Sequence, residues 1–169
     1  IAYSIYVLAR NKRARLGEMR YYADEKLKNF GTPMAKAQLA AALALYGDEE
    51  RAERAFRAAI SDIDPNAVSG VTRRLGSDYG SVLRDGAATL ALISETGLRA
   101  RLIPTVSNLL DANRVSADVG STSTQEKAWL LLAANALFDE SPTYRLAVNG
   151  ARPAGPLSRT LPPPLLDAS

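Results

Sequence analysis

The sequence contains no cysteine and no histidine. Without cysteine, the chain can form no disulfide, no thiolate nucleophile and no cysteine-ligated zinc or iron–sulfur site of its own. Without histidine, it lacks the usual proton carrier near neutral pH and the commonest ligand of transition metals. A serine hydroxyl would therefore have no histidine base to activate it. We expect no catalytic residue, no metal site and no cofactor in this chain.

Aromatic residues are also scarce, at 7% of 169 residues, and the hydrophobic 47% is dominated by alanine and leucine. That composition favours helices over strands. The net charge is only +3, and the one dense basic run, Lys12-Arg13-Ala14-Arg15, contains no aromatic residue to stack on a base. No apolar run approaches the roughly 20 residues that span a bilayer. We therefore expect neither nucleic-acid binding nor direct membrane insertion.

Apolar residues recur at helical spacing in seven segments, separated by capping and breaking residues. The expected helices are one ending near Asn11, one from Leu16 to Asn29, one capped by Thr32 and closed by Gly47, one capped by Asp48, one from Ser81 to Gly97, one with Pro104 in its first turn, and one entered through Ser123.

The chain changes character after residue 141. Tyr144 to Val148 alternates like a short strand, Asn149-Gly150 is a strong turn signal, and five prolines lie between Pro153 and Pro164. We therefore expect a helical segment over residues 1–141, followed over residues 142–169 by the start of a β domain or an extended, proline-rich tail.

The segment STSTQEK, residues 121–127, contains two hydroxyl residues placed three positions before a Gln or Glu. Thr122 with Gln125, and Ser123 with Glu126, both match the capping box, in which the two side chains satisfy each other's backbone donors. A similar segment, residues 78–85, precedes and enters an earlier helix. There Arg84-Asp85 is interpreted either as an anion site or as a cap with an internal ion pair.

The expected helices alternate between nearly uniform apolar character and amphipathic character, as an inner layer covered by an outer layer would. Two architectures fit: a tetratricopeptide-like solenoid or an α/α toroid built of antiparallel helical hairpins. The apolar helices begin near residues 33, 81 and 124, which is wider than a fixed repeat of about 34 residues. This spacing favours the toroid and an all-α fold.

A toroid could also be a glycosidase that uses paired carboxylates, and Asp78, Asp85 and Glu126 lie near helix starts. Acidic residues at these positions also cap backbone donors and offset the helix dipole, and that interpretation is favoured. The single tryptophan, Trp129, lies inside an apolar helix, where we expect it to be buried rather than to form a sugar platform.

Five segments, in this order along the chain, resemble bacterial alpha-2-macroglobulin family proteins. They are residues 6–10 (YVLAR), 35–40 (AKAQLA), 77–85 (SDYGSVLRD), 123–131 (STQEKAWLL) and 146–150 (LAVNG). The resemblance implies a large periplasmic protease trap whose helical toroid carries a Cys–Gln thioester. Because the chain has no cysteine, Gln125-Glu126 is not that motif. The segment looks like the later helices of the thioester domain plus the first strand of the following β domain.

The resemblance also implies that the inner helices run parallel, so that Thr32, Ser81 and Ser123 share the rim on which the thioester lies. Candidate residues of this rim are Thr32, Tyr79, Ser81, Arg84, Asp85, Ser123, Gln125 and Glu126.

The function implied for the parent protein is broad-spectrum protease inhibition in bacterial host defence, not catalysis. Its partners would be target proteases, bound through the full-length protein, and the remainder of the same polypeptide. The implied location is periplasmic, with or without an inner-membrane anchor on the parent. The chain enters helical patterning at Ile1 without an initiator methionine, which suggests a piece of a longer protein. A tetratricopeptide-like scaffold for protein–protein interaction is the alternative.

Overall fold

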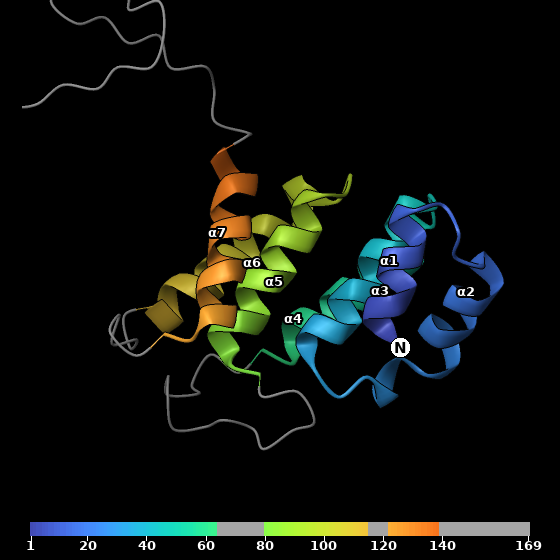
Figure 1. Cartoon of the computed structure of the whole chain (residues 1–169), viewed down its shortest axis with the longest axis horizontal. Helices are drawn as coiled ribbons and strands as arrows, with labels where there is room; N and C mark the ends of the chain where they lie inside the picture. Colours follow the sequence, from blue (N-terminus) through green and yellow to red (C-terminus); the bar gives the residue numbers. More distant parts are fainter. Residues whose placement is uncertain (64–79, 115–121, 139–169) are drawn as a thin grey trace, which may run out of the picture. The chain divides into compact units, whose positions relative to one another are not determined.

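The computed structural model describes residues 1–63, 80–114 and 122–138, all within one unit, Ile1–Asp139 (Figure 1). Within these ranges the regular structure is entirely helical, which confirms the all-α class. The elements are α1 (Ala2–Arg10), α2 (Leu16–Glu25), the 3-10 helix η1 (Leu27–Asn29), α3 (Pro33–Leu45), α4 (Glu49–Ser61), α5 (Val82–Ser94), α6 (Arg99–Arg114) and α7 (Thr124–Phe138). The expected change at residue 142 and the proline-rich segment lie outside the described residues.

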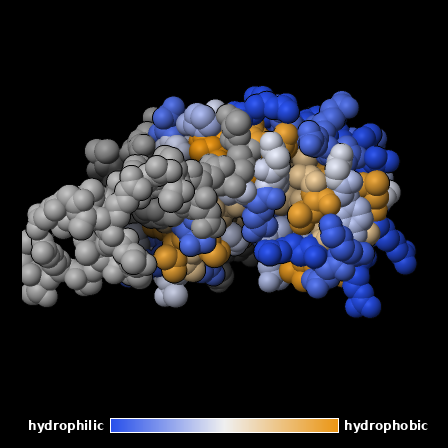
Figure 2. Space-filling model, turned by 90° about the horizontal axis from the view of Figure 1, so that it is seen from above, coloured by the Kyte–Doolittle hydropathy of each residue, from blue (hydrophilic) through white to orange (hydrophobic). Residues whose placement is uncertain are grey.

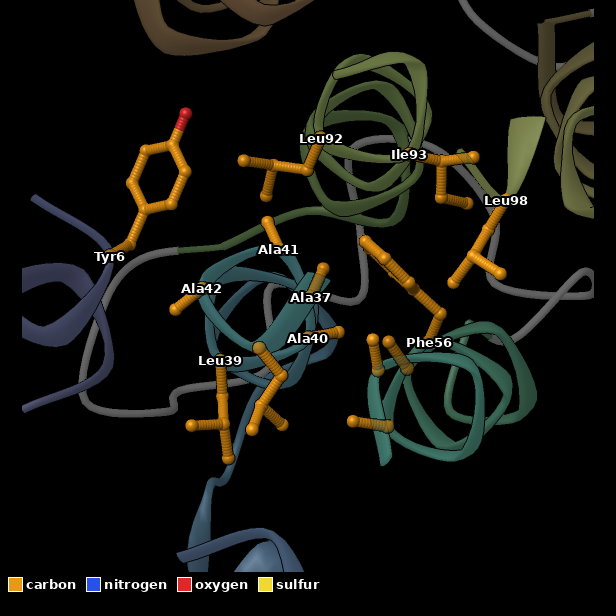
Figure 3. Packing of buried hydrophobic residues seen from close by; sticks show 14 of the residues in the cluster. Tyr6, Ala37, Leu39, Ala40, Ala41, Ala42, Phe56, Leu92, Ile93 and Leu98 are labelled. Carbon is orange, nitrogen blue, oxygen red and sulfur yellow. The ribbon is translucent and has the colours of Figure 1, made fainter. Parts of the chain in front are cut away.

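Helices α3 and α5 form the inner layer. Helix α3 packs on α1, α2, α4 and α5, and α5 packs in turn on α6 and α7. Small residues such as Ala37, Ala40 and Ala41 are fully buried along α3, and Phe56 of α4 packs beside them (Figure 3). Their small side chains allow neighbouring helices to approach closely. The uniform apolar character expected of inner helices is therefore confirmed for these two.

Helices α1 and α7 were expected to be inner helices too, but part of each remains exposed. Leu131 is 72% exposed, and Tyr3 and Leu8 are also exposed. Trp129, expected to be buried, is only partly buried. The reason is that α7 packs chiefly on α5, so the described residues cover only one of its faces. Figure 2 shows apolar side chains lying among strongly hydrophilic ones on the surface of the described helices.

The ends of α3 agree with the expected signals. Thr32 is the N-cap, and its Oγ1 accepts a hydrogen bond from the backbone N–H of Ala35 at 3.2 Å. Beyond the C-terminus, Gly47 has φ +76°, a conformation that favours glycine, and the N–H of Asp48 donates to the Leu43 carbonyl at 3.0 Å. The chain can thus reverse direction tightly between α3 and α4.

Three local predictions were wrong. The second helix does not run to Asn29, because α2 ends at Glu25 and the chain continues as η1. Asp48 stands at the N-cap position of α4 but makes no side-chain capping bond. Its Oδ2 accepts instead from Arg20 Nε of α2 at 2.6 Å. Burial acts to raise the pKa of Asp48, but Arg20 and Arg51 outweigh it and hold the pKa below its ordinary value.

The third wrong prediction concerns α6, which begins at Arg99, so that Pro104 lies inside the helix rather than in its first turn. The start lies upstream because Leu98, Leu102 and Val106 form a buried stripe at helical spacing. A hydroxyl group also marks the start, since Thr96 Oγ1 accepts from the N–H of Leu98 at 3.2 Å.

Candidate functional site at the N-termini of α5 and α7

The site begins with the residue that precedes α5. Ser81 has the extended backbone of an N-cap, and its Oγ accepts a hydrogen bond from the N–H of Arg84 at 3.1 Å. This bond satisfies one of the backbone donors that the first turn of a helix leaves without an intrahelical partner. Ser81, at which the helix was expected to begin, is therefore its N-cap.

The start of α7 forms the expected capping box between Ser123 and Glu126. The N–H of Glu126 donates to Ser123 Oγ at 3.2 Å, and the N–H of Ser123 donates to Glu126 Oε2 at 2.6 Å. The structure thus explains the polar segment before α7 as a helix start.

A hydrogen bond between side chains links the two helix starts. The hydroxyl of Ser81 donates to Glu126 Oε1 at 2.5 Å, although the two residues lie 45 positions apart. The two carboxylate oxygens of Glu126 therefore serve different helices: Oε2 caps α7, and Oε1 holds the cap of α5. The short contact is a charge-assisted bond, which is stronger than a bond between neutral groups.

An ion pair lies directly behind this link. Arg84 donates to Asp85 Oδ1 from Nε at 3.0 Å and from Nη2 at 2.5 Å, and both side chains are nearly buried, at 3% and 9% exposure. The third guanidinium nitrogen, Nη1, lies 3.5 Å from Gln125 Oε1 of α7. The geometry supports the cap with an internal ion pair over an anion site.

Six of the eight candidate residues are thus brought together at one end of α5 and α7. They are Ser81, Arg84, Asp85, Ser123, Gln125 and Glu126. Thr32 is not part of this cluster in the described contacts; it caps α3, which begins at the same lower side of Figure 1 as α5 and α7. Tyr79, and the carboxylate of Asp78 considered for a glycosidase, lie outside the described residues.

The cluster offers little for acid–base catalysis. A catalytic carboxylate must be within hydrogen-bond reach of the substrate proton, whereas Asp85 receives two bonds from a buried arginine and Glu126 binds the starts of two helices. Among the described residues, no group of three potential ligands is placed to hold a metal ion, and no helix is long and apolar enough to cross a membrane.

The link from Ser81 to Glu126 was missed by the sequence reasoning, which treated the two helix starts separately. The available signal was that both capping segments lead into strongly apolar helices, and α5 and α7 do pack on each other. A pocket lined by Tyr21, Tyr22 and Phe30 was also missed. Tyr21 and Tyr22 lie in α2 and Phe30 directly follows η1, and neither segment has a local pattern that marks a site.

The fold and the cluster define a class: an all-α protein of stacked helices in which the neighbouring helices α5 and α7 are joined at their N-termini. No protein-family model matches the sequence. Alpha-2-macroglobulin of Escherichia coli is 32% identical over 138 residues, which are 82% of this chain and 8% of that protein. Alpha-2-macroglobulin of Xylella fastidiosa is 37% identical over 97 residues, 57% of this chain and 6% of the relative.

Solved structures give the same result. The native conformation of E. coli alpha-2-macroglobulin matches 82% of this chain with a TM-score of 0.62 and 31% identity. Salmonella alpha-2-macroglobulin reacted with methylamine matches 80% with a TM-score of 0.62 and 32% identity. The chain belongs to the bacterial alpha-2-macroglobulin family. It spans less than a tenth of the length of these relatives.

Proposed function

We propose that this chain is a non-catalytic helical part of a bacterial alpha-2-macroglobulin-like protease inhibitor and corresponds to later helices of the thioester domain. The supporting observation is that about four-fifths of the chain matches the E. coli protein both in sequence and in fold. A solenoid scaffold gains no comparable support. The residue that would form a thioester must come from outside this chain, because the chain contains no cysteine.

In this proposal, the end of the inner helices that carries Ser81 and Glu126 is the rim on which the family's thioester lies. The cluster would hold α5 and α7 in fixed register at that rim, since Glu126 bonds to both helix starts. The buried pair of Arg84 and Asp85 would fix the first turn of α5 behind it. Thr32, at the start of α3, and Tyr79 belong to the same proposed rim.

The wider assignment follows from the same family membership. Residues 1–141 would form part of an α/α toroid, and residues 142–169 would begin the next, β domain. The partners would be the remainder of the same polypeptide and, through the full-length protein, target proteases. Exposed apolar residues on α7, including Leu131 and Leu132, would be covered by the remainder of the polypeptide. The location would be the periplasm and the role bacterial host defence.

Methylamine provides a direct test of the missing reactive residue. The isolated chain and the longer natural protein that contains it are each incubated with methylamine and analysed by intact-mass spectrometry. We expect no mass increase for the isolated chain and incorporation of one methylamine by the longer protein. An adduct on the isolated chain would contradict the assignment.

The rim assignment needs its own test, in the longer protein. Gln125→Cys places a thiol at the proposed rim, whereas Asn135→Cys places one two to three turns further along the same helix; both native side chains are exposed. If the rim faces the thioester region, reaction with methylamine should change the maleimide labelling rate at position 125 and leave position 135 unchanged. Peptide mapping separates these thiols from any native cysteine. Equal changes at both positions would contradict the assignment.

A further inference from the structure

A pocket of about 550 Å³ lies away from the cluster, among the starts of α1 and α3, the C-terminal half of α2, and η1. Its volume falls within the roughly 300–1,000 Å³ of typical ligand sites. We call it the aromatic pocket and define it by Tyr21, Tyr22, Lys26, Asn29 and Phe30; its lining is completed by Ile1, Ala2, Gly31, Thr32 and Ala35.

Three aromatic rings form one wall of the aromatic pocket. Tyr22 stands between Tyr21 and Phe30, and both ring pairs have centroids 5.8 Å apart in edge-to-face geometry. Edge contacts of this kind hold rings at fixed angles. The arrangement is therefore formed before any ligand arrives, and the outermost ring, that of Tyr21, is 51% exposed. A bulky apolar side chain can cover it without displacing a buried group.

Lys26 is the one charged side chain among the residues that line the aromatic pocket. The ammonium of Lys26 lies over the Tyr21 ring, 5.9 Å from its centroid. Neither Lys26 nor the exposed Lys28 forms a salt bridge with a carboxylate among the described residues, although several arginines nearby do. Lys26 is thus a cation held at an apolar wall, where a ligand carboxylate would add a charge-assisted bond.

The mouth of the aromatic pocket is suited to an extended chain. Nothing lies within 4 Å of a Cβ built on Gly31, so the backbone there is open to an approaching ligand. Asn29 is exposed at the same edge, and its side-chain amide can both donate to and accept from a peptide group. The aromatic rings can contact an apolar side chain of a peptide, Lys26 can bind a carboxylate, and the Asn29 amide can bond to the peptide backbone. Together these features are suited to a peptide.

We propose that the aromatic pocket binds an acidic segment of a partner protein, with a large apolar side chain on Tyr21 and a neighbouring carboxylate on Lys26. This proposal is independent of the thioester assignment. Thr32 lines the aromatic pocket and also belongs to the proposed rim, but the ligand contacts proposed here are made by Tyr21 and Lys26, and they neither require nor exclude a reactive residue elsewhere.

Fluorescence anisotropy provides the test, with the chain titrated against a short fluorescein-labelled peptide of alternating glutamate and phenylalanine. Two control peptides are used. One alternates lysine and phenylalanine and tests the need for negative charge; the other alternates glutamate and alanine and tests the need for an aromatic side chain. We expect the acidic aromatic peptide to bind at least about tenfold more tightly than either control peptide. Equal affinity for acidic and basic peptides, or no binding at all, would overturn the proposal.

Matched variants locate the site. Lys26→Glu should weaken binding about tenfold, whereas Lys127→Glu, the same charge reversal on exposed α7, should change it less than about twofold. Tyr21→Ala should also weaken binding about tenfold, as expected for an aromatic anchor. Circular dichroism melts confirm that each variant folds, and Lys26→Glu remains decisive if Tyr21→Ala proves unstable. Equal effects of the two lysine variants would indicate general electrostatics and refute the site.

Two further measurements exclude other occupants. Vesicles of anionic phospholipid should not displace the peptide; displacement would identify a membrane surface instead and would overturn the proposal. The longer natural protein should bind the same peptide with similar affinity. If the longer protein does not bind the peptide, another part of the same polypeptide fills the aromatic pocket. That result would also refute the proposal that a separate partner protein binds there.

Discussion

The ion pair between Arg84 and Asp85 allows a quantitative prediction of stability. Replacing Arg84 with methionine keeps an unbranched apolar stem but leaves the nearly buried carboxylate of Asp85 without its guanidinium. Breaking a buried pair by removing one partner costs about 3–5 kcal/mol. With a urea m-value of about 2 kcal/mol/M, the unfolding midpoint should fall by roughly 1.5–2.5 M. Urea titrations followed by circular dichroism measure this shift.

The control uses the same substitution at an exposed pair. Arg10 is 58% exposed and lies 3.4 Å from Glu95, so Arg10→Met should cost about 0–1 kcal/mol. The double variant Arg84→Met/Asp85→Leu should recover most of the loss, because a buried pair replaced by apolar residues is often nearly neutral. The reasoning fails if Arg84→Met costs no more than Arg10→Met, or if the double variant is as unstable as the single one.

Three other predictions concern single side chains. Ser81→Ala removes the N-cap of α5 and the donor to Glu126, and should lower the free energy of unfolding by about 1–2 kcal/mol in urea titrations, whereas Ser81→Thr should retain most of it. Burial, together with the hydrogen bond to Glu95, raises the pKa of Tyr6 to about 12 from 10.0. Folding therefore favours the protonated phenol, so this stability is fully present below pH 10 and lost as the pH rises towards 12; thermal melts of Tyr6→Phe should lack that alkaline loss. Phe56→Ala, at a fully buried site, should cost about 3–5 kcal/mol, and a calorimetric loss below about 1 kcal/mol would contradict the packing described for α4.

Local sequence signals were sufficient for the inner helices and for the capping box of the candidate site. Apart from Lys36 and Gln38, helix α3 is apolar all round, and that pattern is stable only where neighbours cover most of the helix. The capping box of Ser123 and Glu126 depends on two residues three positions apart, so sequence spacing alone predicts it. These predictions needed no knowledge of which helices pack together.

Contacts between helices were not predictable in the same way. Arg54 follows Glu50 by four positions within α4, a spacing that favours a local ion pair, but it pairs with Asp24 of α2. Asp48 was expected to cap α4, but Arg20 of α2 takes its carboxylate. In both cases a polar side chain had one possible partner on its own helix and another on α2. The packing of α2 on α4 decided between them, and sequence spacing carries no information about that packing.

The central position of α3 has a consequence for how the chain opens. Because α3 packs on four other helices, its backbone amides should exchange with deuterium only when the whole unit unfolds. Helix α7, by contrast, packs chiefly on α5 and should separate in a smaller opening of lower free energy. The hydrogen bond from Ser81 to Glu126 links α7, the helix expected to open easily, to the start of α5, which packs on α3. A change that breaks this bond would therefore act on the part of the unit that opens most easily.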